Sequence, residues 1–318
     1  MNAWTAKAGT RQIARLLCLI GAALLGAELV GRFVVPRVSK IEARVVMEEA
    51  AAHDLRATPG APPATLIVGN SLLLASVTIA ELTRQLEPEW HTQRFVVESS
   101  EYNDWYFGLR NLFANGSRPN PVVLMLNPRQ LIADNIRGAY SAFHLFSAAD
   151  SVRAGVRAGL HPTIISGLVL GHFSAYYGTR EETRKVAFQK VVPRASELAA
   201  VLVGSLRPAR EIDGSNLRSE SARRLVELSR LCAAYAVRCM FVLAPRLGGT
   251  NSEDLIVIHE AERAGLRAAD LQPDDTWSMK DFEPDGFHMN PNGAVGFTAA
   301  FGTALKAALG QPRHLRNP

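Results

Sequence analysis

Two short segments, far apart in the chain, carry the residues best suited to nucleophilic chemistry. The first is Gly69-Asn70-Ser71-Leu72, which directly follows an apolar run. A serine in a tight turn after a buried strand projects into the crevice beyond the sheet, and an amide of that turn can stabilise an oxyanion. A serine in such a place is also a common helix cap, so a nucleophilic role for Ser71 requires a partner.

The partner is found in the second segment, Asp285-Gly286-Phe287-His288, just before the last helical pattern. Within a turn, this spacing lets Asp285 accept a hydrogen bond from His288, which selects the tautomer of the imidazole and stabilises its cation. His288 is then able to remove a proton from Ser71. The other interpretation makes His288 a capping or surface residue, and the spaced aspartate together with the serine turn favours the catalytic one.

Positioning these residues requires a scaffold that gathers strand ends at one edge. Short apolar runs bounded by turn residues predict buried parallel strands at 65–68, 94–97, 121–126 and 238–244. Helical patterns lie between and after these runs, notably at 220–235 and 291–309. Strands that alternate with helices predict an α/β fold, in which helices cover both faces of a parallel sheet.

The N-terminal segment predicts a membrane anchor. Three basic residues, Lys7, Arg11 and Arg15, precede an apolar stretch that extends as a helix over 12–35. That length is sufficient to cross a hydrocarbon layer of about 30 Å, and the basic flank predicts a cytoplasmic N-terminus. No small-x-small cleavage site follows the apolar core, so an uncleaved signal-anchor is favoured over a cleaved signal peptide.

Glu28 is an ionisable residue within this helix, and such a group requires a partner or an interface. Two placements are open. Glu28 could face a partner helix, or it could lie near the outer boundary of the membrane with Arg32. The second placement is favoured.

The remaining sequence divides into segments of distinct character. The apolar patch at 162–171 is interpreted as part of a helical subdomain packed on the sheet, with a lid or a membrane-facing surface as the alternative. We expect a cytoplasmic basic tail at 1–11, a helical stalk and proline-rich linker at 36–64, an α/β domain at 65–133 and 195–310, a helical insertion at 134–194 and a tail at 311–318.

Composition excludes several classes of function. Among the 318 residues, with a net charge of +5, no basic run is interleaved with aromatic residues, so nucleic acid is not an expected partner. Three cysteines without a Cys-x-x-Cys spacing exclude a disulfide scaffold, and we expect neither metal nor cofactor. Cys232 and Cys239 either pair or, as is favoured, remain buried thiols.

In its two motifs and their order, the chain resembles the SGNH (GDSL-like) hydrolase family over about 65–309. The resemblance implies a three-layer, flavodoxin-like parallel sheet. It also implies that Ser71 is the nucleophile, His288 the general base and Asp285 its orienting carboxylate.

The middle blocks of that family are altered here. Its second block supplies a glycine amide to the oxyanion hole, whereas this chain has Glu98-Ser99-Ser100-Glu101, in which Ser100 or a neighbour would have to serve. Its third block is Gly-x-Asn-Asp. Here Asn127 ends the strand, about two residues out of register, and Arg129 occupies the apparent place of the asparagine. Loss of one oxyanion donor typically slows a reaction by about 100- to 1,000-fold.

Some membrane-anchored members of the family modify cell-envelope polymers, and the resemblance implies a similar function for this chain. We expect a serine esterase or O-acyltransferase that acts on acyl esters of an envelope polysaccharide or glycolipid. It would lie at the outer face of a bacterial inner membrane, with its main domain in the periplasm, beside a membrane-bound O-acyltransferase. One alternative is a catalytically weak or inactive module that binds an envelope glycan or membrane partner. Another is a lipase or thioesterase whose insertion lines an acyl channel.

Overall fold

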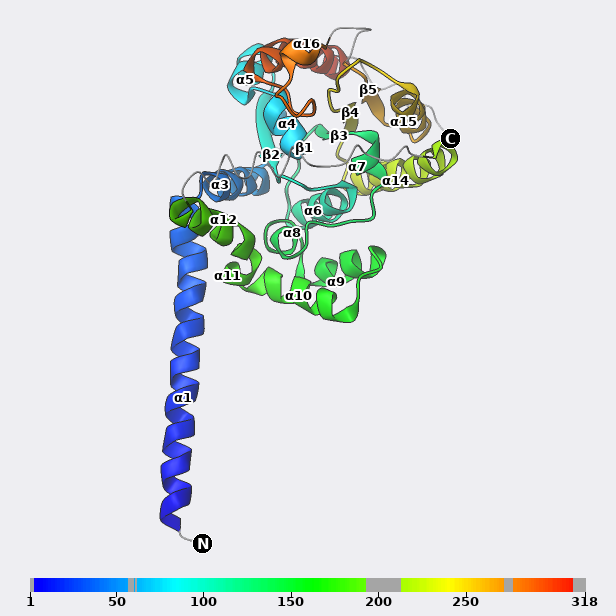
Figure 1. The fold of residues 1–318 in the computed structure, drawn as a ribbon. Coiled ribbons are helices and arrows are strands. Elements are labelled where there is room, and N and C mark those ends of the chain that lie inside the picture. The colour runs from blue at the N-terminus through cyan, green and yellow to red at the C-terminus, as the bar shows by residue number, and fades with distance from the viewer. Residues whose placement is uncertain (1–2, 57–59, 61, 193–212, 272–276, 311–318) are drawn as a thin grey trace.

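The computed structural model describes residues 3–56, 60, 62–192, 213–271 and 277–310. A long N-terminal helix, α1, projects away from an α/β body (Figure 1). The helices are α1 (Ala3–Leu29), the π-helix η1 (Val30–Val34), α2 (Val35–Val38), α3 (Lys40–Asp54), α4 (Ser71–Ser76), α5 (Ile79–Leu86), α6 (Tyr102–Ala114), α7 (Pro128–Ile132), α8 (Ala139–His144), α9 (Ala148–Arg157), α10 (Pro162–Phe173), α11 (Ala175–Gly178), α12 (Arg180–Val191), α14 (Gly214–Ala234), α15 (Ser252–Arg263), the 3-10 helix η2 (Met279–Asp281) and α16 (Pro291–Gly310).

The body contains an all-parallel sheet of five strands in the order β2-β1-β3-β4-β5. The strands are β1 (Ala64–Gly69), β2 (His91–Val96), β3 (Val122–Leu126), β4 (Cys239–Leu243) and β5 (Arg267–Ala269). The four predicted apolar runs all form strands, with β2 beginning three residues earlier than expected. The fifth strand was not predicted, because Arg267-Ala268-Ala269 has neither the length nor the apolar character of a buried strand.

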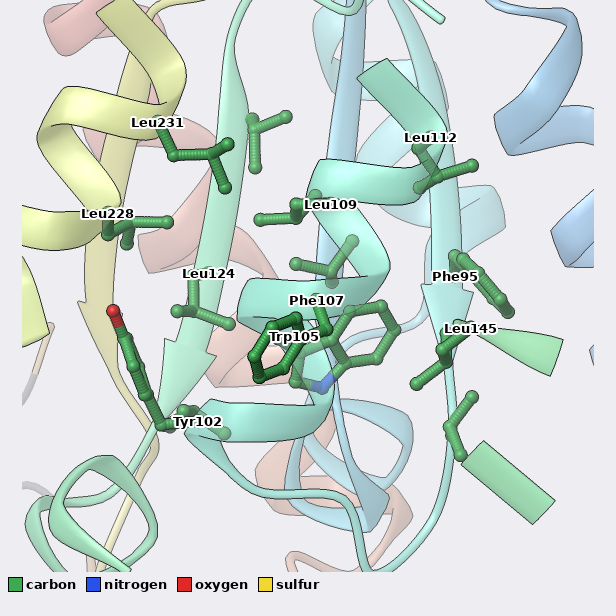
Figure 2. Packing of buried hydrophobic residues seen from close by; sticks show 14 of the residues in the cluster. Phe95, Tyr102, Trp105, Phe107, Leu109, Leu112, Leu124, Leu145, Leu228 and Leu231 are labelled. Carbon is green, nitrogen blue, oxygen red and sulfur yellow. The ribbon is translucent and has the colours of Figure 1, made fainter. Parts of the chain in front are cut away.

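Helices cover both faces of the sheet, as the alternation of strands and helices predicts. Successive side chains of a strand point to opposite faces, so Leu66 and Val68 of β1 join one core and Ile67 joins the other. Helices α6, α14 and α15 complete the first core, and α4, α5 and α16 complete the second. Around α6, the rings of Trp105 and Phe95 pack edge to face, with 5.4 Å between their centroids (Figure 2).

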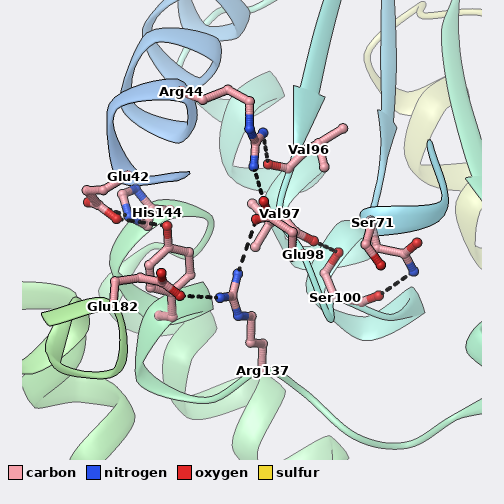
Figure 3. Close-up of polar contacts among 12 residues, drawn as sticks. Glu42, Arg44, Ser71, Val96, Val97, Glu98, Ser100, Arg137, His144 and Glu182 are labelled. Atoms are coloured by element: carbon pink, nitrogen blue, oxygen red, sulfur yellow. Dashed lines mark hydrogen bonds and ion pairs between the residues drawn. The ribbon is translucent and has the colours of Figure 1, made fainter. Parts of the chain in front are cut away.

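Helix α3 is part of the body and does not form the stalk expected at 36–64. Its Val45 and Ala52 are completely buried. Strand β2 lies at the edge of the sheet, and α3 covers that edge. Arg44 Nη1 donates to the carbonyl of Val96 at 2.8 Å (Figure 3). The carboxylate of Glu48 accepts from the amide of Val96 at 2.7 Å. These bonds satisfy backbone groups that an open edge would leave unpaired.

Helices α8 to α12 lie within the segment 134–194, for which a helical insertion is predicted, and the part of that segment beyond Val192 lies outside the described residues. The apolar patch at 162–171 lies in α10, whose Leu168 is buried while Leu170 is half exposed. At the N-terminus, one helical segment, Gln12–Val38, is long and apolar enough to cross a membrane. Most of its side chains lie outside the packed body, whereas Gly31 and Val35 are buried.

Cys232 and Cys239 are free thiols, of which Cys232 is buried and Cys239 half-buried. Contact with Cys232, together with burial, raises the pKa of the Cys239 thiol.

A buried ionic cluster joins α3 to the insertion. The imidazole of His144, on α8, contacts the carboxylate of Glu42 at 3.1 Å (Figure 3) and that of Glu49 at 2.6 Å. The hydroxyl of Tyr140 donates to Glu42 at 2.8 Å. Burial of His144 opposes its cation, but the two carboxylates outweigh burial and raise its pKa to about 9. The cluster therefore holds a charged histidine at neutral pH.

We predict that His144→Gln destabilises the protein by about 3–5 kcal/mol at pH 7, because it leaves two carboxylates without their buried cation. In the parent protein, the stabilisation from this raised pKa is fully present below the unfolded value of about 6.5 and is lost as the pH rises through about 9. Denaturant unfolding in detergent at pH 6, 8 and 10 measures both effects. The exposed His91→Gln is the control, and an equal pH dependence in the parent and in His144→Gln would contradict the prediction.

Candidate active site

Ser71 lies directly beyond the carboxyl end of β1, at the first position of α4. The turn depends on Gly69, because a Cβ atom at this position would lie 2.7 Å from the carbonyl oxygen of Met125 in β3. Only glycine allows the two strands to approach so closely. Ser71 is partly exposed, so its side chain is accessible from solvent.

Asn70 positions the serine turn through both ends of its carboxamide. Its oxygen accepts from the amide of Leu72 at 3.0 Å and so caps α4. Its nitrogen donates to the carbonyl of Ser100 at 2.9 Å, across the gap to the loop that follows β2 (Figure 3). The side chain is almost completely buried. The sequence motif contained Asn70 without a role for it, although the preference for asparagine before a helix was the available signal.

Asp285 and His288 occupy one turn, as their spacing predicts. The carboxylate of Asp285 contacts His288 Nδ1 at 2.8 Å, and its other oxygen accepts from the backbone amides of Phe287 and His288 at 2.8 and 3.0 Å. Burial opposes the anion, but these hydrogen bonds, led by that of the imidazole, hold the pKa of Asp285 below its usual value. Asp285 is therefore an anion throughout the neutral range.

The turn is held in place by Asn290, a second residue to which the sequence motifs assigned no role. Its carboxamide nitrogen donates to the carbonyls of Lys280 and Phe282 at 2.7 and 3.1 Å. Its oxygen accepts from the amides of Asn292 and Gly293, at the start of α16. Asn290 therefore links the residues that precede the Asp285–His288 turn to the start of α16.

Helix α16 carries this turn to the serine. Thr298 of α16 accepts from the amide of Thr78 at 3.0 Å and approaches the carbonyl of Ser76 at 3.4 Å, where α4 ends. Phe297 and Phe301 of the same helix are completely buried in the core that α4 also lines. The packing of α16 against α4 therefore determines where His288 lies.

The structure brings the three predicted residues together. His288 Nε2 lies 2.9 Å from Ser71 Oγ, although 217 positions separate the two residues in the chain. With Nδ1 directed at Asp285, Nε2 is the atom that accepts the serine proton. The arrangement of hydroxyl, imidazole and carboxylate is that of a serine nucleophile activated by a general base.

No protein-family model matches the chain, and no curated protein matches its sequence.

Ser100, one of the three predicted oxyanion donors, does not offer a free donor group. It is completely buried, and its amide and hydroxyl both donate to the carbonyl of Val97, at 3.3 and 2.6 Å. Its hydroxyl oxygen also accepts from the indole of Trp105 at 2.8 Å. The tight loop after β2 uses these groups internally, so Ser100 supports the site through its bond from Asn70.

Asn127 ends β3, the strand beside β1, and so lies at the same edge of the sheet as Ser71. Its carboxamide oxygen caps α7 by accepting from the amide of Gln130 at 2.9 Å, and its backbone amide donates to the side chain of Gln130 at 3.1 Å. In the described part of the chain, the carboxamide nitrogen of Asn127 makes no hydrogen bond. This nitrogen is therefore the available oxyanion donor of the residue.

Arg129, the third predicted oxyanion donor, lies in the first turn of α7, two residues beyond Asn127. The backbone amide of Ser71 is another available oxyanion donor, since it makes no hydrogen bond to any described residue.

Among the described residues, no group of three or more His, Cys, Asp or Glu side chains is arranged to hold a metal ion.

We predict that Asn70→Ala lowers the free energy of unfolding by about 1–3 kcal/mol, because α4 loses its cap and a buried carbonyl loses its donor. The substitution should also slow the reaction of Ser71 with a fluorophosphonate, since the serine turn loses its support. Asn251→Ala, which removes the cap of α15 from a distant loop, should be destabilising to a similar degree without changing that rate. Labelling of Asn70→Ala at the parent rate would contradict a positioning role.

Proposed function

We propose that this protein is a membrane-anchored serine esterase or O-acyltransferase of SGNH-like architecture, with Ser71 as its nucleophile. The observation that carries the proposal is the pair of contacts that links Ser71 Oγ, His288 and Asp285, at 2.9 and 2.8 Å. The strand order β2-β1-β3-β4-β5 supports the architecture, because it is the order of flavodoxin-like sheets, which bind ligands beyond the carboxyl ends of their strands.

The reaction follows from this geometry. His288 Nε2 accepts the proton of Ser71 as Oγ attacks the carbonyl carbon of an acyl ester. The negative charge develops on the former carbonyl oxygen, where the amide of Ser71 and the carboxamide nitrogen of Asn127 are the candidate donors. The C–O bond to the leaving alcohol then breaks, and His288 returns the proton to that alcohol. Water or a sugar hydroxyl resolves the acyl-serine by the reverse sequence of steps.

The N-terminal helix supports a location at a membrane. Gln12–Val38 is apolar, is exposed over most of its length and follows the basic residues Lys7 and Arg11. A basic flank is typical of the cytoplasmic side of a membrane, which favours a body in the periplasm of a bacterial cell. There the substrate would be an acyl ester of an envelope polysaccharide or glycolipid, and a membrane-bound O-acyltransferase would be a suitable partner.

A second candidate function is a binding module for an envelope glycan, without catalysis. The specific observation in its favour is the state of the loop after β2, where the donors of Ser100 are used internally. An oxyanion hole that lacks the contribution of this loop has to rely on Asn127 and the amide of Ser71.

We predict that a fluorophosphonate probe labels the purified protein and that Ser71→Ala abolishes both labelling and the hydrolysis of an aryl acetate. Ser219→Ala, which removes an exposed hydroxyl from α14, should leave both unchanged. His288→Ala should be nearly as severe as Ser71→Ala, because the members of a triad act as a unit. Asp285→Asn should lower the rate by up to about 10,000-fold through the wrong tautomer. A folded parent protein that neither labels nor hydrolyses an activated ester would favour the binding module.

A separate prediction concerns Asn127. Asn127→Ser retains an oxygen that caps α7 but loses the carboxamide nitrogen, so we expect a loss of about 100- to 1,000-fold in kcat with little change in stability. Steady-state hydrolysis and denaturant unfolding of the same preparation distinguish the two effects. An unchanged kcat would assign the oxyanion to backbone amides or to Arg129.

A further inference from the structure

The strongest observation outside the active site is the attachment of the helical insertion to the N-terminal helix. The carboxylate of Glu28 accepts from the hydroxyl of Ser174 and the amide of Ala175, both at 2.9 Å, at the start of α11. Arg32 pairs with Glu28 at 2.7 Å and donates to the carbonyl of Phe173 at 3.2 Å. The ion pair of Glu28 and Arg32 therefore binds the N-terminal helix to the junction of α10 and α11.

The two backbones also touch at this junction. A Cβ atom at Gly31 would lie 2.5 Å from the amide nitrogen of Tyr176, so only glycine permits the contact. Gly31 is buried, although most of the helix around it is exposed. Figure 1 shows α10 and α11 beside the upper part of α1, on the side of the sheet toward which the long helix leaves.

The position of this junction along the helix matches a membrane boundary. Arg11 and Arg32 are 21 residues apart, which corresponds to about 30 Å of helix, the thickness of the hydrocarbon layer. With Arg11 at the inner boundary, Arg15 lies one turn further in, from where a long arginine side chain can extend back to the inner headgroups. Glu28 and Arg32 then lie at the outer boundary. The insertion is attached at this same level.

Large apolar side chains are exposed there. Leu170 and Phe173 of α10 are 50% and 62% exposed, and Tyr176 of α11 is 44% exposed. We call these three residues the apolar shelf. In the described part of the chain nothing covers them, whereas Leu168 of the same helix is buried in the body. Aromatic residues such as tyrosine favour the boundary between hydrocarbon and water.

We propose that the apolar shelf inserts into the outer leaflet of the bilayer beside the N-terminal helix, so that the insertion forms a second, interfacial contact with lipid. The proposal rests on the membrane anchor of the proposed function. Glu28, Arg32 and Gly31 set the depth of the shelf, and two separate contacts with lipid hold the body in one orientation above the membrane.

Fluorescence quenching in the full-length protein tests this proposal. Single cysteines replace Leu170 or Phe173 in a background in which Cys18→Ser, Cys232→Ala and Cys239→Ala remove the native thiols. Each carries a fluorophore in vesicles of phosphatidylethanolamine and phosphatidylglycerol. The label at Cys18 is placed in a background that carries Cys232→Ala and Cys239→Ala alone. Leu255→Cys, on α15, is the matched control because Leu255 is 61% exposed on the body. Native Cys18, which is exposed on α1, reports the anchor independently.

We expect lipids with a shallow nitroxide to quench the labels at 170 and 173 several-fold more than the label at 255, and lipids with a deep nitroxide to quench the label at Cys18. Gly31→Val should weaken lipid quenching at 173, whereas Gly26→Val should not, because nothing lies within 4 Å of a Cβ atom at Gly26.

Three results would overturn the proposal. If iodide quenches the shelf labels as strongly as the label at 255 while Cys18 remains in lipid, the shelf is rejected and the anchor stands. If iodide reaches Cys18, the anchor fails and the shelf fails with it. If the shelf labels are protected from both quenchers, protein and not lipid covers this surface.

Discussion

Strand β1 lies between two parallel neighbours, and its close packing against β3 at Gly69 determines where the chain can place a reactive side chain. All strands of a parallel sheet end at the same edge, so the turns after β1, β2 and β3 are necessarily neighbours. Asn70 holds two of these turns in a fixed relative position, because its carboxamide bonds both to the start of α4 and to the loop after β2. These contacts determine the position of Ser71.

The charged groups of the molecule fall into two kinds with different consequences. Asp285 and His288 are each about a third exposed, so the pair remains close to water and can exchange protons with a substrate. Glu42 and His144 are almost completely buried, and a change in their protonation costs folding free energy. The first pair suits acid–base chemistry, and the second fastens α3 to α8.

The path from the N-terminal helix to the sheet is packed along much of its length. Helix α3 covers the edge of β2 through Arg44 and Glu48, and Glu28 and Arg32 attach the insertion to the long helix. The orientation of the body relative to that helix therefore follows from specific contacts. The same contacts determine which way the sheet edge that carries Ser71 faces relative to the long helix.

The sequence alone was sufficient to predict the parallel α/β architecture and the pairing of Asp285 with His288, because buried strands and a three-residue turn are local patterns. It also indicated Ser71 through the turn that follows β1. The contact between His288 and Ser71 needed the tertiary structure, since it depends on how α16 packs against α4. The same is true of α3, whose contacts with the edge strand span 48 and 52 residues of the chain. It is also true of Ser100, whose donors bond within its own loop. Such bonds join residues that no sequence periodicity relates, and only the folded chain brings them together.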